Sequence, residues 1–202
     1  MILVTRLFSC LSLIVLSSCV SLLPDPGTAP MRIWLEPALI TSPLRDPTSS
    51  QKIIAVMQPT ATNMLDSERL RIRDLTGTIA LVDHIAGVEW QDHLPIMVQR
   101  HLVQALTRSK KFKAIGLEED SFKRNFVLET DIQTFDVVIL PDKMYAEITL
   151  SAKLLENQGR DVIWQKAFIS KAPIANHSLQ AFIMSLTKAY ETVLYQITQD
   201  VN

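Results

Sequence analysis

The stretch Trp90–Leu117, WQDHLPIMVQRHLVQALTRSKKFKAIGL, decides the fold, because it joins an amphipathic helix to a short apolar segment. At 100° per residue its apolar side chains fall on one stripe, as in a helix that packs one face against a core. Asp92 is expected to cap the first turn, and Pro95 lies where a missing N–H does no harm. The basic residues that follow predict a helix end near Ser109. The stripe consists of Leu94, Val98, Leu102, Ala105 and Leu106, with Met97 at its margin.

Two apolar residues of this helix, Ile96 and Val103, lie almost opposite the main stripe. Isolated apolar side chains are common on protein surfaces, so one interpretation is that these two are exposed without any function. The alternative is a surface that contacts another protein. We therefore take Ile96 and Val103 as candidate partner-contact residues. Directly after the helix, Phe112, Ala114 and Ile115 predict a strand.

Residues 1–18 form a segment of a different kind. Arg6 precedes an apolar run from Leu7 to Leu16, which is too short to cross a bilayer of about 30 Å as a helix. The run ends in Leu16-Ser17-Ser18-Cys19, which resembles the lipobox of bacterial lipoproteins at every position. In those proteins the signal peptide is cut before the cysteine, which becomes acylated. The resemblance implies lipidation of Cys19; an ordinary secretory signal with an incidental cysteine is the alternative.

The composition excludes several classes of partner. The chain has 202 residues with 20 basic and 21 acidic side chains and no long basic run, so nothing points to nucleic acid. Both cysteines lie at or before position 19, so the mature chain could form no disulfide. Its stability must therefore come from packing.

Residues 19–50 predict a tether between the lipid anchor and the folded domain. Six of the ten prolines lie between Ser21 and Ser50, and proline favours extended backbone. Ile33-Trp34-Leu35 interrupts the tether as a candidate edge strand. We expect one domain over residues 51–202.

Three candidate strands precede the helix. Lys52–Met57 is a β-branched apolar run, which is typical of a buried strand, and Thr78–Val82 is a shorter candidate. Arg69–Arg73 alternates, with Leu70 and Ile72 on one face and three arginines on the other. The arginines could bind an anion or a headgroup, but a solvated face is the commoner arrangement.

A meander of strands follows the helix. Asn125–Ile139 is one long strand whose apolar phase shifts, which predicts a bulge near residues 133–135. Met144–Leu154 alternates throughout and leaves Tyr145 on its polar face, so Tyr145 is a third candidate partner-contact residue. Residues 157–159 predict a hairpin loop, and Val162–Ser170 the returning strand.

The chain closes with a helix that Asn176 or Ser178 can cap and that reaches to about Thr198. Its apolar stripe is wide, which indicates a core helix. Strands, helix, strands and helix in this order predict the α+β class. We expect a single domain with one mixed, mostly antiparallel sheet and two long helices on one face.

The sequence carries no catalytic motif that we recognise. It lacks G-x-S-x-G, H-E-x-x-H and a glycine-rich phosphate loop. His93 and His101 lie eight residues apart, too far to share one metal by themselves. Glu129 and Asp131 could perform acid–base chemistry, but carboxylates on alternate strand positions are more often solvated. We therefore predict no catalytic residue, no metal and no cofactor, and binding in place of an enzyme activity.

The order of features resembles the ABC-type transport auxiliary lipoproteins, the PqiC-like group. The similarity covers nearly all of residues 50 to 200. It departs from the family at the first strand, which is usually tyrosine-rich, and at the loop from Thr76 to Val88. The matching residues are Ile54-Ala55-Val56, Pro59, Leu65-Asp66, Trp90, Leu94, Leu102, Leu106, Phe112 and Phe168.

This resemblance implies a non-catalytic accessory subunit of an MCE-type lipid transporter, often driven by an ABC ATPase. It implies an MCE-domain protein as partner, an outer-membrane lipid anchor with the domain facing the periplasm, and support of the envelope lipid barrier. Val20 after the cysteine, in place of an aspartate, is similar to lipoproteins sorted to the outer membrane. The resemblance also raises a homo-oligomeric ring as an arrangement of this chain with further copies of itself. The alternative function is a scaffold for assembly of outer-membrane proteins or lipopolysaccharide.

Overall fold

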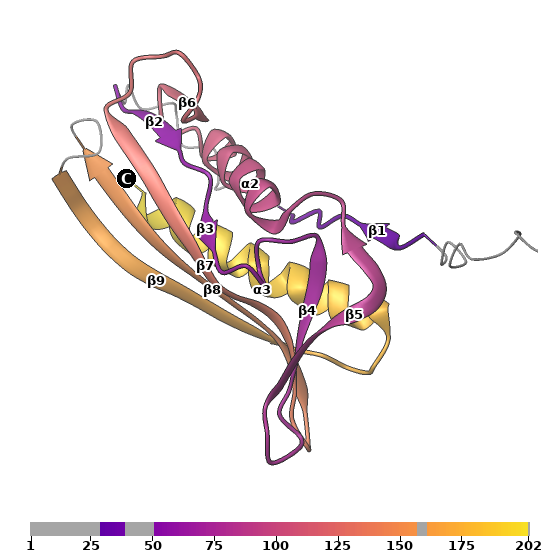
Figure 1. The fold of residues 1–202 in the computed structure, drawn as a ribbon. Helices are drawn as coiled ribbons and strands as arrows, with labels where there is room; N and C mark the ends of the chain where they lie inside the picture. Colours follow the sequence, from indigo (N-terminus) through magenta and orange to yellow (C-terminus); the bar gives the residue numbers. More distant parts are fainter. Residues whose placement is uncertain (1–28, 39–50, 157–160, 202) are drawn as a thin grey trace, which may run out of the picture. The chain divides into compact units, whose positions relative to one another are not determined.

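The computed structural model describes residues 29–38, 51–156 and 161–201. Within them, a mixed sheet of nine strands carries two long helices on one face (Figure 1). The predicted α+β class and the helices on a single face are therefore confirmed. No helix in these ranges is long and apolar enough to span a bilayer. The elements are β1 (Met31–Ile33), β2 (Ile53–Val56), β3 (Thr60–Ala61), β4 (Arg69–Asp74), β5 (Leu81–Trp90), α2 (Leu94–Ser109), β6 (Ala114–Leu117), β7 (Phe126–Ile139), β8 (Met144–Glu156), β9 (Asp161–Pro173) and α3 (Leu179–Asp200).

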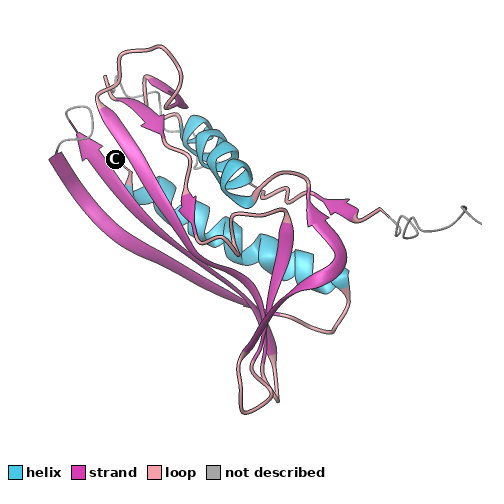
Figure 2. Cartoon of the chain, in the orientation of Figure 1, coloured by secondary structure: helices cyan, strands magenta, loops and turns pink. Residues whose placement is uncertain are grey.

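Strand β7 is the centre of the sheet. Along one side it pairs with β8, antiparallel over its whole length, and β8 pairs in the same way with β9. Along its other side it pairs in parallel with three shorter strands in succession, β2, β3 and β4. Strand β5 is antiparallel to β4, and β1 and β6 add parallel pairs at the margins. The long antiparallel hairpins thus hold several parallel segments in one sheet (Figure 2).

Helix α2 ends at Ser109, as predicted, and Lys110 leaves it in the left-handed conformation at φ 53°. Pro95 lies in the first turn, also as predicted. The expected cap by Asp92 is wrong, because its carboxylate accepts a hydrogen bond from Arg100 at 2.7 Å. The amide of Leu94 donates instead to the carbonyl of Ser67 at 3.1 Å, so another segment satisfies this helix start.

Two strands around α2 differ from the prediction. The expected strand Thr78–Val82 is confirmed at Leu81 and Val82, where β5 (Leu81–Trp90) begins, and is wrong for Thr78 to Ala80, which lie in the turn. Gly87, at φ 70°, interrupts the alternation of β5, so the sequence pattern does not reveal how long this strand is. Phe112 precedes β6 and is not part of it.

The meander agrees well with the prediction. The register of β7 against β8 shifts between Ile132 and Thr134, which confirms the bulge. The turn after β7 is closed by a hydrogen bond from the amide of Leu140 to the carbonyl of Lys143 at 2.8 Å. Strand β9 continues to Pro173, beyond the expected Ser170. The hairpin loop expected at residues 157–159 lies outside the described residues.

Helix α3 is capped by Ser178, whose hydroxyl accepts a hydrogen bond from the amide of Ala181 at 3.2 Å.

The apolar stripe of α3 packs against β7, β8 and β9, and a row of contacts between aromatic rings crosses the core. The ring centroids lie 5.8 Å apart for Trp90 and Phe135, 5.3 Å for Phe135 and Tyr190, 5.6 Å for Tyr190 and His101, and 5.5 Å for His101 and Trp34.

The segment before residue 39 is part of this packing. β1 pairs with β5 at Met31–Ile33, so it overlaps the expected edge strand at Ile33 only. Leu35 is fully buried in the core. The amide of Ala38 donates to the carboxylate of Glu191 on α3 at 2.6 Å. The core contacts therefore begin before residue 51.

Candidate functional site

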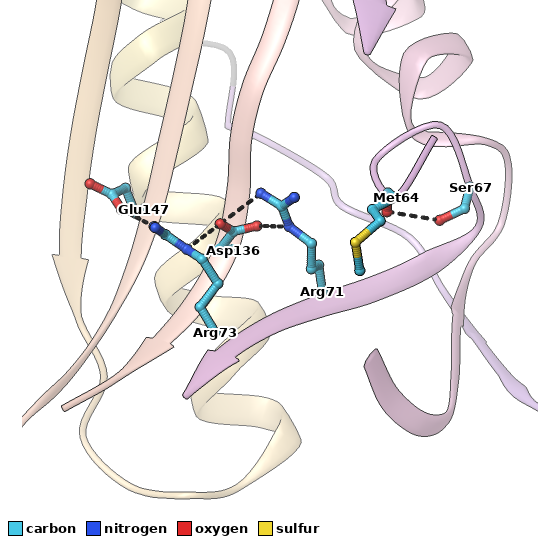
Figure 3. A network of polar contacts seen from close by, with 6 residues as sticks. All are labelled: Met64, Ser67, Arg71, Arg73, Asp136 and Glu147. Atoms are coloured by element: carbon cyan, nitrogen blue, oxygen red, sulfur yellow. Dashed lines mark hydrogen bonds and ion pairs between the residues drawn. The ribbon is translucent and has the colours of Figure 1, made fainter. Parts of the chain in front are cut away.

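A row of charged side chains crosses the helix-free face of the sheet. Asp136 on β7 accepts hydrogen bonds from Arg71 on β4 at 2.5 Å and 2.8 Å, and it pairs with Arg73 at 2.6 Å. Arg73 also donates to Glu147 on β8, and Lys171 on β9 pairs with Glu147 at 2.7 Å. Figure 3 shows Arg73 between the two carboxylates. We name these five residues the charge row.

Three side chains of the charge row, those of Asp136, Arg71 and Glu147, are largely shielded from solvent, whereas that of Lys171 is 52% exposed. The Asp136 side chain is fully buried and that of Arg71 is 11% exposed. Burial raises the pKa of Glu147, but hydrogen bonds from Lys171 and Arg73 and their charges outweigh this and leave the pKa below its ordinary value. The hydrogen bond to Glu147 raises the pKa of Lys171.

The predicted solvated face of the arginines is therefore wrong for Arg71 and Arg73. Register explains it, because β4 and β7 pair in parallel and place Arg71 beside Asp136. Their charges are satisfied by carboxylates of the same chain, so they hold strands together. The anion-site alternative loses its main support for these two arginines.

The three candidate partner-contact residues lie in different surroundings. Ile96 and Val103 are half-buried, although the helical wheel placed them outside, and Val103 packs against the core. Tyr145 is also half-buried, and the ammonium of Lys171 lies 4.9 Å from the centre of its ring. Ile96 and Val103 share α2, whereas Tyr145 is on β8 beside the charge row.

The acidic candidates Glu129 and Asp131 border a polar pocket of about 410 Å³ between the β2–β3 segment, β7, β8 and β9. Glu129 forms an ion pair with Lys153 at 3.1 Å, and Asp131 accepts a hydrogen bond from Thr60 at 2.6 Å. Each carboxylate thus has a neighbouring donor. Their arrangement stabilises the strand pairing and gives no positive sign of acid–base chemistry.

The two helix histidines occupy opposite environments. His101 is 1% exposed, between Trp34 and Tyr190, and burial lowers its pKa from 6.5 to about 4. His93 is half-exposed, and its Nδ1 lies 3.3 Å from Asp66. Within the described ranges, no three His, Cys, Asp or Glu side chains are grouped to hold a metal ion.

The sequence of the folded domain matches a known protein family. The family model of the ABC-type transport auxiliary lipoprotein component matches residues 37–198. The chain belongs to this family. The resemblance in sequence is thereby confirmed, and the auxiliary lipoprotein is a component of an ABC-type transport system. No curated protein is similar enough to the chain to count as a match.

Solved structures share the fold of this auxiliary lipoprotein. The crystal structure of a Xanthomonas campestris protein is 23% identical, covers 84% of this chain and 91% of its own, and superposes with a TM-score of 0.66. An uncharacterised protein with 11% identity covers 86% of this chain and 99% of its own, with a TM-score of 0.65. A hypothetical protein from Chlamydia trachomatis has 10% identity, covers 75% and 96%, and has a TM-score of 0.54.

Sequence patterns missed two features of the auxiliary lipoprotein that the structure reveals. In the charge row, Arg71 and Asp136 are 65 positions apart and Arg73 and Glu147 are 74 apart, and no local pattern exists for such contacts. The second feature is a cluster of exposed apolar residues in the turn between β4 and β5, where Ile79 is 74% exposed. An uncharged run between Asp74 and Asp83 is the available signal, but its apolar residues also fit a strand, which does begin at Leu81.

Proposed function

We propose that this auxiliary lipoprotein is a non-catalytic accessory subunit of an MCE/ABC-type system that transports lipids, such as phospholipids, between membranes. It would be anchored in the outer membrane, face the periplasm and support the envelope lipid barrier. The family match over residues 37–198, behind a lipobox at Cys19, carries the proposal. The acyl chains would contribute about 0.8 kcal/mol per buried CH₂, so several chains hold the domain to one leaflet.

The anchor is tested by replacing Cys19, which lies outside the described residues. We expect Cys19→Ser to lose acylation, because serine lacks the sulfur that the lipid would modify. Mass spectrometry of the native chain should show an acylated terminus beginning at residue 19, and gradient fractionation should place it with the outer membrane. Cys10→Ser is the matched control and should keep both properties. An unmodified terminus in the native chain would contradict the anchor.

The partner is tested by capture of an MCE-domain protein with the intact chain. Ile96 is the most suitable of the three candidate partner-contact residues. Val103 packs against the core, and Tyr145 contacts Lys171 of the charge row, so substitutions there would also disturb the fold. We expect Ile96→Asp to weaken capture about tenfold or more, as for a central interface residue. Gln104→Asp, at an exposed position of the same helix, is the matched control.

Two results would redirect the proposal. If Ile96→Asp changes the mass of the isolated protein, then Ile96 and Val103 contact a second copy, as in a ring. If the chain captures an outer-membrane barrel protein and no MCE-domain protein, the assembly-scaffold function replaces the transport one. Tyr145→Ala, measured in parallel, tests the third candidate contact without altering α2.

A further inference from the structure

Two hairpin turns lie together at one end of the sheet. Residues 75–80 join β4 to β5, and residues 140–143 join β7 to β8. Asp74 pairs with Ile139, and the amide of Leu75 donates to the Ile139 carbonyl at 2.9 Å, so the turns are held side by side. Figure 1 shows both extending past the helices. We name residues 75–82 and 140–143 the hairpin tip.

The hairpin tip presents apolar side chains to solvent. Ile79 is 74% exposed, Leu81 61% and Val82 43%. No charged residue lies between Asp74 and Asp83, and the charges of the hairpin tip are those of Asp142 and Lys143 in its second turn. Asp74 accepts hydrogen bonds from the amide of Thr76 at 2.9 Å and from its hydroxyl at 2.6 Å, which fixes the start of the turn. The exposure is therefore a property of an ordered turn, and such patches mark protein or membrane contacts.

The size of the hairpin tip favours lipid over protein. A stable protein interface uses about 20–30 residues on each side, whereas the hairpin tip has twelve residues, of which Ile79, Leu81 and Val82 are large exposed apolar side chains. A bilayer needs no complementary shape, and a few apolar side chains at the end of a hairpin can enter its interface.

The base of the hairpin tip carries a cationic side chain of the kind that binds the phosphates of lipid headgroups. A cleft of about 400 Å³ next to the turn of β7 and β8 is lined by Lys143 and Lys171. The ammonium of Lys171 pairs with Glu147 at 2.7 Å, so Lys143 is the lysine considered for a lipid phosphate. Lys143 is exposed, and its stem can extend along apolar surface while its charge meets a lipid phosphate. The cleft is lined by Leu140, Lys143, Met144, Tyr145, Lys171 and Pro173.

We propose that the hairpin tip enters the interface of a phospholipid bilayer, with Ile79, Leu81 and Val82 among the upper acyl chains and Lys143 at the phosphates. This contact is separate from the lipid on Cys19 and goes beyond the proposed function. It would orient the domain on the membrane, because two points of attachment restrict rotation more than a single tether does.

The test uses the intact chain in vesicles of phosphatidylethanolamine and phosphatidylglycerol. A thiol introduced by Ile79→Cys in a Cys10→Ser background carries an environment-sensitive fluorophore. We expect its emission to shift to the blue and to fall about twofold when lipids carry a nitroxide on the acyl chain, as for a side chain at the acyl boundary. Ser121→Cys, exposed near the opposite end of β7, is the matched control and should show neither change.

Accessibility to aqueous iodide decides the outcome. A label at position 79 that iodide quenches equally with and without vesicles overturns the proposal, whether or not an added protein then protects it. Flotation of the chain with the vesicles reports the anchor separately, and labelling of the Cys10→Ser chain alone reports whether the thiol of Cys19 is free. An unchanged circular dichroism spectrum confirms that the exposed substitution leaves the fold intact.

Discussion

Replacing Asp136 by asparagine is expected to lower the free energy of unfolding by about 3–5 kcal/mol, the cost of removing one partner from a buried ion pair. The amide keeps the shape of the carboxylate but loses its charge. Arg71 then has no counter-charge from Asp136 at a site where its side chain is 11% exposed, and Arg73 keeps only Glu147. Urea unfolding of Asp136→Asn against the native chain measures the difference.

The chain offers a matched control for this prediction. Asp92 pairs with Arg100 at 2.7 Å, but the two side chains are 29% and 54% exposed. Because solvent screens such a pair, Asp92→Asn should cost less than about 1 kcal/mol. Equal losses for the two variants would show that burial gives the charge row no special weight. A triple variant, Arg71→Met, Arg73→Met and Asp136→Leu, should recover part of the loss, because no unpaired charge remains near β7.

The contrast between local and distant contacts explains which parts of the fold the sequence predicts. The end of α2 at Ser109, the cap of α3 at Ser178 and the bulge after Ile132 follow from residues close in sequence. The parallel pairing of β4 with β7 does not, because strands joined through other elements leave no pattern of their own. The charge row depends on that pairing, so the alternation of β4 taken alone predicts solvent around its arginines.

The candidate site follows the same rule. The lipobox and the family resemblance depend on local motifs, and the family is confirmed. The surface positions of Ile96 and Val103 depended on an isolated helical wheel, which ignores the neighbours that half-bury both. The exposure of the hairpin tip does not follow from its sequence, because its apolar residues fit a strand, and Leu81 and Val82 do lie in β5 while remaining 61% and 43% exposed. Helical periodicity identifies the buried face of α2 well, but it does not tell how far neighbouring elements cover the opposite one.

Acidification from about pH 7.5 to about pH 5 is expected to cost the protein about 2 kcal/mol of unfolding free energy through His101 alone, given its pKa of about 4 in the folded chain. Burial between Trp34 and Tyr190 lowers this pKa, and Nδ1 of the ring has no hydrogen-bond partner within the described ranges. The unfolded chain therefore binds the proton near the ordinary pKa of 6.5, before the folded chain does. The contribution is complete above that value and is lost as the pH falls toward 4.

His101→Phe should remove this part of the pH dependence, because phenylalanine keeps an aromatic ring between Trp34 and Tyr190 but takes up no proton. His93→Gln is the matched control on the same helix and should retain the dependence, since His93 is half-exposed. Glu147 adds little to the pH dependence in this range. Because its pKa is lowered in the folded chain, its contribution to the free energy of unfolding is kept until the pH falls below the ordinary glutamate value of 4.5. Urea unfolding of the three proteins at both pH values gives the comparison. If His101→Phe and the native chain lose equal stability, the titrating group lies elsewhere and the aromatic packing of His101 tolerates its charge.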